Sequence, residues 1–182
     1  MDRTRRMLLG LVGLAGGSAL LHGLTRSGLA GAAGSAAGGS GKHVFEVVKT
    51  DAEWRTSLTP AQFRVLRQAG TEYPFSSPLD REKRSGTFAC AGCGLALFSS
   101  KTKFDSRTGW PSFWQPLDNA VVEEADYSMG MRRVEVLCRR CGGHLGHVFE
   151  DGPPPTGLRY CMNGLAMSFT PTGEKTPAGD AS

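Results

Sequence analysis

The second half of the chain alternates short apolar segments with polar turn residues, which is the pattern of β-strands. From Gly86 onward these segments are bounded by Gly, Pro, Asn and Asp, and no long helical period appears. A further apolar stretch at residues 44–48 is expected to be a short strand or an extended approach. The pattern predicts a mainly β protein with strands over residues 87–89, 95–98, 133–137 and 166–169.

One helix is expected before this β-rich part. Thr59 and Pro60 are typical of a helix start, with Thr as the N-cap and Pro at the first helical position. Phe63 and Leu66 then fall on one face, and Gly70 ends the helix. Because the helix contains no candidate chemistry, we expect it to serve packing.

The first 32 residues have the pattern of an export signal. Arg5 and Arg6 precede an apolar, Gly-rich stretch, and Ala30-Gly31-Ala32 offers a small-residue cleavage site. Adjacent arginines suit the twin-arginine route, so we expect an exported, periplasmic protein. The alternative is an uncleaved membrane anchor, although the apolar run is near the lower limit for a membrane span and contains His22.

The net charge is concentrated in this leader. The formal charge of the chain is +4, and residues 1–32 hold four Arg against one Asp, which leaves the remainder at +1. A near-neutral body without a basic stripe argues against a nucleic-acid partner and against a membrane-surface protein.

The five cysteines divide into two Cys-x-x-Cys pairs and one single residue, Cys161. Each pair follows a predicted strand and precedes a glycine, Gly94 or Gly142, which can supply the left-handed backbone of a tight turn. Two such pairs complete a closed, structural zinc shell. Two redox dithiols and an iron–sulfur site are the alternatives. The predicted zinc ligands are Cys90, Cys93, Cys138 and Cys141.

The single cysteine lies near a histidine pair that changes its interpretation. The apolar and aromatic flanks of Cys161 alone fit an inert, buried thiol. His144 and His147, however, are suited to donating a proton near a thiolate at neutral pH. Extra metal ligation is the alternative for this pair. His22 and His43 lie in the leader and the lead-in and are interpreted as incidental.

An aromatic segment supplies a second candidate surface. Residues 103–114 contain four aromatic residues, among them Trp110. The segment is either a core loop or an apolar wall for a group resembling a methyl thioether, and both interpretations can hold for different rings.

Taken together, these motifs resemble those of the methionine sulfoxide reductase B family. The resemblance spans about residues 51–169, and the two Cys-x-x-Cys pairs match the zinc site of the family. The matching motifs are Phe104-Asp105-Ser106 with Gly109-Trp110-Pro111-Ser112-Phe113, then His144-Leu145-Gly146-His147-Val148-Phe149, then Gly152-Pro153, Thr156-Gly157 and Arg159-Tyr160-Cys161-Met162-Asn163.

The resemblance implies a mostly antiparallel β fold of two sheets, in a tent-like or barrel-like arrangement, with small N-terminal helices and one structural zinc ion. It implies an oxidoreductase that reduces the R epimer of protein-bound methionine sulfoxide. It also implies these roles: Cys161 as the nucleophile, Trp110 as the ring on the substrate methyl group, and His144, His147 and Asn163 as the polar groups around the sulfoxide oxygen.

Two positions depart from the family pattern. Many members have a resolving cysteine where Thr108 stands, and this chain has no spare cysteine elsewhere. The commoner sequence after the nucleophile is Ile-Asn-Ser, whereas here it is Met162-Asn163-Gly164. The first departure predicts a single-cysteine mechanism, and the second removes a hydroxyl group next to the site.

A sulfoxide sulfur is a poor electrophile until its oxygen is protonated or hydrogen-bonded. We therefore expect Cys161 to attack sulfur, His144 or His147 to protonate the oxygen, and Arg159 to favour the thiolate. The product on the enzyme is a sulfenic acid. A small thiol or a thioredoxin-like partner is expected to reduce it.

The domain expectation follows from these assignments: an export signal at 1–32, a flexible lead-in at 33–45, a reductase catalytic domain at 46–170 and a polar tail at 171–182. The mature chain is expected to have no stable membrane insertion. A non-enzymatic zinc-ribbon binding module would leave Cys161, the histidines and the aromatic segment without purpose. Another thiol-dependent enzyme on a similar zinc-bearing β fold is the second alternative.

Overall fold

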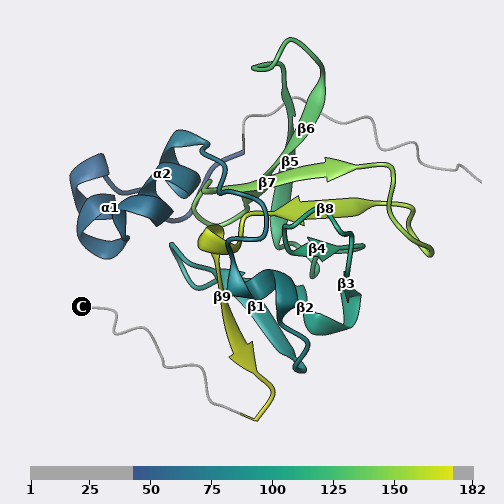
Figure 1. Ribbon diagram of the computed structural model, residues 1–182. Coiled ribbons are helices and arrows are strands. Elements are labelled where there is room, and N and C mark those ends of the chain that lie inside the picture. Colours follow the sequence, from purple (N-terminus) through teal and green to yellow (C-terminus); the bar gives the residue numbers. More distant parts are fainter. Residues whose placement is uncertain (1–42, 174–182) are drawn as a thin grey trace, which may run out of the picture. The chain divides into compact units, whose positions relative to one another are not determined.

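Nine short strands form two antiparallel sheets in residues 43–173, the part of the chain that the computed structural model describes (Figure 1). The smaller sheet has the order β2-β1-β9, and the larger has the order β3-β4-β8-β7-β6-β5. The predicted export signal lies outside the described residues. The strands are β1 Gly86–Cys90, β2 Ala96–Ser99, β3 Lys103–Phe104, β4 Ser112–Phe113, β5 Val121–Asp126, β6 Arg133–Cys138, β7 His144–Phe149, β8 Arg159–Met162 and β9 Met167–Pro171.

The prediction of a mainly β fold with two antiparallel sheets is confirmed, and strands occur at the four places where the apolar pattern predicts them. Residues 44–48 form no strand, although the Val47 N–H donates to the Arg140 carbonyl at 2.9 Å. The other five strands, β3, β4, β5, β7 and β8, were not predicted from the sequence. The side chains of β5 are half-buried or exposed, so this edge strand lacks the apolar alternation that marks a strand in the sequence.

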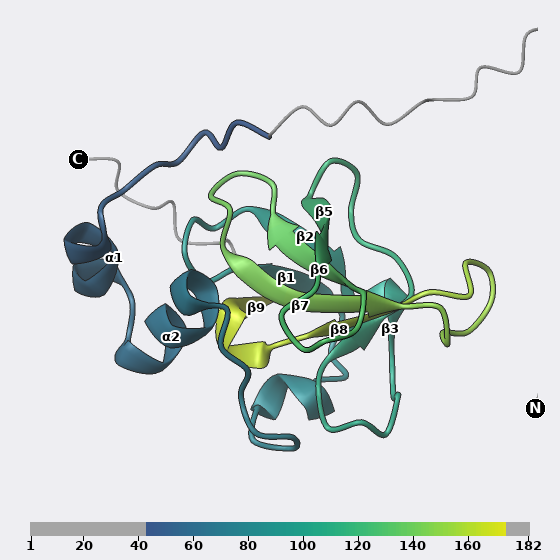
Figure 2. The same cartoon turned by 90° about the horizontal axis from the view of Figure 1, so that it is seen from above.

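Two short helices lie together on one side of the sheets, α1 at Asp51–Ser57 and α2 at Pro60–Gln68 (Figure 2). The predicted start of α2 is confirmed, because Thr59 accepts a hydrogen bond from the Gln62 N–H in a capping box. Its left-handed end residue is Ala69, directly before the predicted Gly70. No helix within residues 43–173 has both the length and the apolar character needed to cross a membrane.

The described residues also contain three one-turn 3-10 helices: η1 Pro78–Arg81 before β1, η2 Ser100–Thr102 between β2 and β3, and η3 Gly164–Ala166 between β8 and β9. The last of these joins β8 of the larger sheet directly to β9 of the smaller sheet. The chain therefore passes from one sheet to the other within a few residues of Cys161.

Aromatic side chains fill the space between the two sheets. Phe88 and Phe98 come from the smaller sheet, whereas Phe113 and Tyr160 come from the larger one. The ring of Phe113 stacks on Phe98 with centroids 4.4 Å apart and meets Phe88 edge-on at 4.9 Å. Pairs of this geometry add to the free energy gained by burying the rings, so they hold the sheets at a fixed separation.

A β-bulge in β7 sets the positions of the two histidines. Val136 of β6 pairs with Gly146, but Leu137, the next residue along β6, pairs with His144, so Leu145 is an extra residue. Residues three apart in a regular strand point to opposite faces. Because the bulge inserts one extra residue, His144 and His147 lie on the same face, and their ring centroids are 5.5 Å apart.

Replacing Gly146 with Ala is expected to destabilise the protein by about 1–3 kcal/mol or more, as overpacking does. A β-carbon at this position would lie 2.1 Å from the Cys161 carbonyl oxygen, so β7 and β8 must separate. Gly92→Ala is the control, because its β-carbon would have no neighbour closer than 3.5 Å. Urea unfolding measures both; equal midpoints for the two variants would contradict this account of the bulge.

Candidate functional site

Cys161 lies in β8 between two neighbouring strands that present polar side chains on the same face. It is directly opposite His147 of β7 and Ser112 of β4. His147 is in turn opposite Glu135 of β6, and Ser112 is opposite Phe104 of β3. Because directly paired residues share a face of an antiparallel sheet, these five side chains form one row across the sheet.

Arg159 lies two residues before Cys161 in β8, so the two residues share a face. Its guanidinium group donates to both carboxylate oxygens of Asp151, at 2.8 and 2.9 Å. Burial raises the pKa of the Cys161 thiol, while the positive charge of Arg159 and the hydroxyl of Thr108 act in the opposite direction. Arg159 therefore favours the thiolate, as expected, but burial is the larger effect and favours the protonated thiol in the unliganded site.

Carboxylates from the neighbouring strand β6 and from β5 beyond it orient both histidines. His147 Nε2 lies 2.8 Å from Asp126 Oδ2, and His144 Nδ1 lies 2.5 Å from Glu135 Oε1. Burial lowers the pKa of His147, and its hydrogen bond with Asp126 opposes that shift. Each ring thus has one nitrogen fixed by a carboxylate, which leaves the other nitrogen for a ligand.

The side chains of Trp110 and Asn163 both form hydrogen bonds with the main chain of Glu72. Trp110 Nε1 donates to the Glu72 carbonyl oxygen at 3.2 Å. Asn163 Oδ1 accepts from the Glu72 N–H at 3.0 Å, and its Nδ2 donates to the Leu145 carbonyl at 3.1 Å. Since an amide nitrogen has two N–H groups, Asn163 keeps one for a ligand. The predicted ring and the predicted amide are therefore held by one residue.

The carboxylate of Glu72 is buried and accepts two main-chain hydrogen bonds. It accepts from the Gly164 N–H at 2.6 Å and from the Leu165 N–H at 2.9 Å, at the start of η3. Burial raises the pKa of this carboxyl group, and the two main-chain hydrogen bonds oppose that shift. A β-carbon at Gly164 would lie 1.9 Å from Ser77 Oγ, which explains why this chain has glycine there.

The aromatic residues of segment 103–114 divide between the two expected roles, a core loop and an apolar wall for a ligand. Phe113 is fully buried between the sheets and belongs to the core. Trp110 is only half-buried, and its indole nitrogen is used by Glu72, so its ring is oriented without being enclosed.

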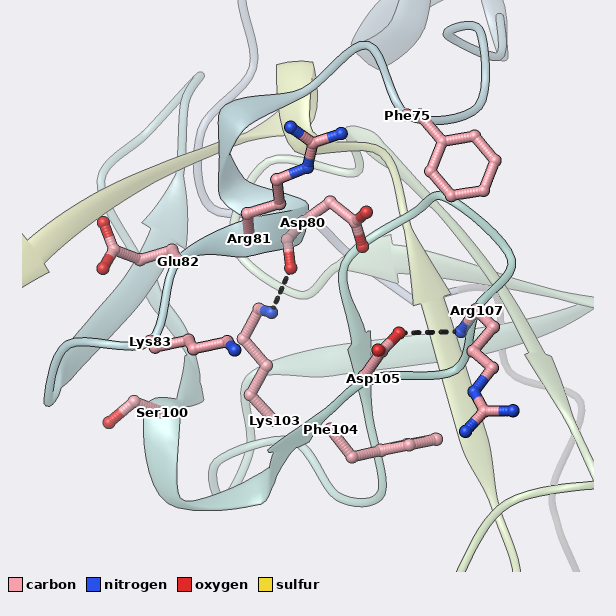
Figure 3. A pocket seen from close by; sticks show the side chains of 10 residues that line it. All are labelled: Phe75, Asp80, Arg81, Glu82, Lys83, Ser100, Lys103, Phe104, Asp105 and Arg107. Carbon is pink, nitrogen blue, oxygen red and sulfur yellow. Dashed lines mark hydrogen bonds between the residues drawn. The ribbon is translucent and has the colours of Figure 1, made fainter.

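A cavity of about 870 Å³ lies beside residues 103–107, the segment that precedes Thr108 (Figure 3). Lys103 reaches across it, with Nζ donating to the Asp80 carbonyl at 2.6 Å. No site residue predicted from the sequence lines the cavity, so we assign it no part in the site. Its lining residues are Phe75, Asp80, Arg81, Glu82, Lys83, Ser100, Lys103, Phe104, Asp105 and Arg107.

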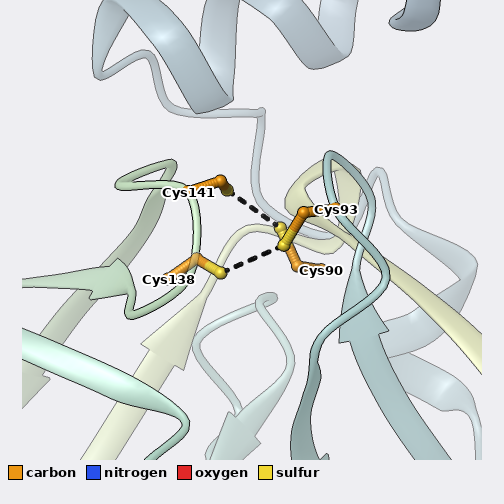
Figure 4. Close-up of side chains that lie close together, drawn as sticks. All are labelled: Cys90, Cys93, Cys138 and Cys141. Carbon is orange, nitrogen blue, oxygen red and sulfur yellow. Dashed lines mark hydrogen bonds between the residues drawn. The ribbon is translucent and has the colours of Figure 1, made fainter. Parts of the chain in front are cut away.

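The four paired cysteines meet in one cluster (Figure 4). Their sulfur atoms all lie within 4.8 Å of one another, with Cys90 to Cys141 at 3.7 Å and Cys93 to Cys138 at 3.5 Å. These sulfur contacts join one cysteine pair to the other, which one shared ion explains and two independent dithiols do not. A tetrahedral shell with Zn–S bonds of about 2.3 Å requires sulfur separations of about 3.8 Å, so the cluster fits a metal ion.

The turns of the cluster have the backbone that the sequence predicts. Gly94 and Gly142, which follow the two pairs, adopt φ angles of 72° and 67°. Within residues 43–173 the candidate metal ligands that gather in space are cysteines alone. The histidine pair is not part of this group, so extra metal ligation by His144 and His147 finds no support.

Comparison with known proteins gives the family. A family model described as the SelR domain matches residues 58–171. The chain belongs to this methionine sulfoxide reductase B family. It is 55% identical over 126 residues to the peptide methionine sulfoxide reductase MsrB of Leptospira interrogans, covering 69% of this chain and 96% of that relative. The MsrB of Methanosarcina mazei is 53% identical over 126 residues, covering 69% of this chain and 90% of its own length.

The carboxylates that hold the site were not predicted from the sequence: Glu72, Asp126, Glu135 and Asp151. Glu72 lies in a connection, and its partners lie 38 positions away, at Trp110, or more than 90 positions away. Asp126 ends β5, and Glu135 lies in β6. No local pattern marks these carboxylates as part of the site.

Glu72→Ala is expected to lower the free energy of unfolding by about 2–4 kcal/mol. The change leaves the buried Gly164 N–H without an acceptor, at about 1–3 kcal/mol, and the half-buried Leu165 N–H as well, at a smaller cost. Glu72→Gln keeps one acceptor oxygen and should lose less. Denaturant unfolding decides this; full stability of the Ala variant would show that the carboxylate does not hold η3.

Proposed function

We propose that this protein reduces the R epimer of methionine sulfoxide in oxidised proteins to methionine, with Cys161 as the nucleophile. The observation that carries the proposal is the row across the larger sheet, in which Cys161 lies directly opposite His147. Membership of the SelR family and the names of the relatives support the same reaction.

In the proposed reaction the Cys161 thiolate forms a bond to the sulfoxide sulfur while His144 or His147 supplies a hydrogen bond and a proton to the oxygen. The bond between the two sulfur atoms and the S–O bond of the substrate then break as the oxygen passes to Cys161. The Cys161 sulfur is oxidised by two electrons to a sulfenic acid, and the substrate leaves as methionine. Trp110 receives the methyl group, and Asn163 donates its remaining N–H to the oxygen. The R epimer is selected because only it presents methyl and oxygen to these groups together.

An external thiol is proposed to complete the cycle. Thr108 Oγ1 lies 4.0 Å from Cys161 Sγ, so the position of the usual resolving cysteine is occupied by a hydroxyl group. The other four cysteines of the chain form the metal cluster. A small thiol or a thioredoxin-like protein is the proposed partner.

The proposed metal is one structural zinc ion held by the four clustered cysteines. Four thiolates fill a tetrahedral shell and leave no open position for substrate. The ion would link the end of β1 in the smaller sheet to the end of β6 in the larger sheet.

We propose export by the twin-arginine route, with residues 1–32 as the cleaved signal and the periplasm as the destination. The support is the sequence pattern of Arg5, Arg6 and Ala30-Gly31-Ala32. An uncleaved membrane anchor is the alternative outcome.

With dithiothreitol as the reductant, the protein should consume R-sulfoxide peptide and leave the S epimer largely intact. Cys161→Ser should abolish turnover, and Trp110→Ala should reduce it without loss of metal. Chiral chromatography of the remaining sulfoxide measures this. Consumption of both epimers at equal rates, or full activity of Cys161→Ser, would reject the proposed function.

Purified protein should contain one zinc per chain, and Cys93→Ser should lose both the metal and cooperative unfolding, because metal binding and folding are coupled. Elemental analysis and thermal unfolding are the measurements. Cys161→Ser is the matched control and should keep the metal. A folded, active protein free of metal would exclude a structural ion.

Changing both Arg5 and Arg6 to Lys should block export and leave the full-length chain in the cytoplasm. Cell fractionation with N-terminal sequencing of the exported form tests this. Export of the variant at the normal rate would exclude the twin-arginine route, and a membrane-bound chain that retains residues 1–32 would favour the anchor.

A further inference from the structure

A line of three hydroxyl groups leads from the main chain of Trp110 to the sulfur of Cys161. Ser112 Oγ donates to the Trp110 carbonyl at 3.0 Å. Ser106 Oγ lies 2.7 Å from Ser112 Oγ and 2.8 Å from Thr108 Oγ1. Thr108 Oγ1 ends the line 4.0 Å from Cys161 Sγ.

Counting protons gives this line a direction. Each hydroxyl group has a single proton, and a carbonyl oxygen can only accept. Ser112 must therefore use its proton on the carbonyl, Ser106 must donate to Ser112, and Thr108 must donate to Ser106. Thr108 then has only a lone pair for Cys161, so the protonated thiol donates to Thr108.

The direction must change when Cys161 loses its proton. A thiolate has no proton to donate and accepts strongly from a neighbouring hydroxyl group. Thr108 can donate a hydrogen bond to the thiolate only if its proton no longer points to Ser106. Ser106 keeps its own donation to Ser112 in either state, so the proton of Thr108 is the single one that changes partner.

We propose that Thr108 is the donor that stabilises the Cys161 thiolate, and that Ser106 is a positioning residue that competes for the same proton. The two hydroxyl groups then act on the ionisation of Cys161 with opposite signs. The proposal deepens the proposed function and rests on it only in taking Cys161 as the nucleophile.

The residue that replaces the resolving cysteine thus acquires a role of its own. Cys161 is largely buried, and burial raises its pKa; Arg159 and Thr108 are the donors that act against this rise. A hydrogen bond from a neutral donor to a buried charge is stronger than one in water. Thr108 also acts on the Cys161 pKa in the direction of the thiolate.

The charged groups around Cys161 stay in place when these hydroxyl groups are changed. Arg159 of β8 favours the thiolate, and Asp151 of the β7–β8 connection opposes it. His147 of β7, with its partner Asp126 of β5, faces Cys161 from the neighbouring strand. On the hydroxyl side, Asp105 and Arg107 are exposed at the edge of the loop (Figure 3).

The test is the pH dependence of Cys161 alkylation by iodoacetamide in the metal-loaded protein, followed by mass spectrometry. Thr108→Val removes the hydroxyl group at nearly constant shape and should raise the midpoint, slowing alkylation about tenfold at neutral pH, the effect of one hydrogen bond to a charged group. Thr108→Ser should stay close to the wild type. Ser106→Ala should lower the midpoint, because Thr108 then gives its proton to the thiolate without competition.

The double variant Ser106→Ala with Thr108→Val provides the coupling control. Because Ser106 acts through Thr108, the double variant should have the midpoint of Thr108→Val alone. An unchanged midpoint in Thr108→Val, or a raised midpoint in Ser106→Ala with normal metal content and circular dichroism, would overturn the proposal. Alkylation needs no sulfoxide, so a protein that shows these shifts but reduces no sulfoxide would reject the proposed function alone.

Discussion

The cysteine cluster is the constraint on which the rest of the structure depends. One pair of its residues ends β1 of the smaller sheet, and the other begins at the end of β6 of the larger sheet. Nearby elements converge on the same turns: Arg67 of α2 donates to the Cys141 carbonyl at 3.0 Å, and the Phe45 ring packs against Gly142. Fixing the cluster therefore fixes the helices and both sheets, including the strand β7 that carries the two histidines.

The register of the paired strands then brings the residues of the site together. The pairing of β4, β8 and β7 places Ser112, Cys161 and His147 side by side, and the bulge at Gly146 brings His144 to the same face. The main chain of Glu72 holds the side chains of Trp110 and Asn163 at this site by hydrogen bonds. Every member is positioned by the pairing of the strands or by hydrogen bonds to the main chain of the buried residue Glu72. Such a site is already arranged before substrate arrives, which is what positioning a thiolate and a proton donor requires.

The sequence was a good guide wherever the chemistry is local. The cysteine pairs, the Thr59 cap and four of the strands are each marked within a few residues, and the structure contains all of them; these strands are β1, β2, β6 and β9. Glu72 and Asp126 could not be predicted, because their partners Asn163 and His147 lie 91 and 21 positions further along the chain. The alignment of His144 with His147 also depends on a bulge, and a regular period would have placed these residues on opposite faces.

The departure at Thr108 makes the single-cysteine cycle the central claim. The most direct measurement is a single turnover with R-sulfoxide peptide in the absence of reductant, followed by mass spectrometry of the intact protein and of its peptides. The account predicts one methionine released per chain, one added oxygen on Cys161 that a sulfenic-acid reagent traps, and retention of the metal. A disulfide between Cys161 and any cysteine of the cluster, formed with release of the metal, would contradict it.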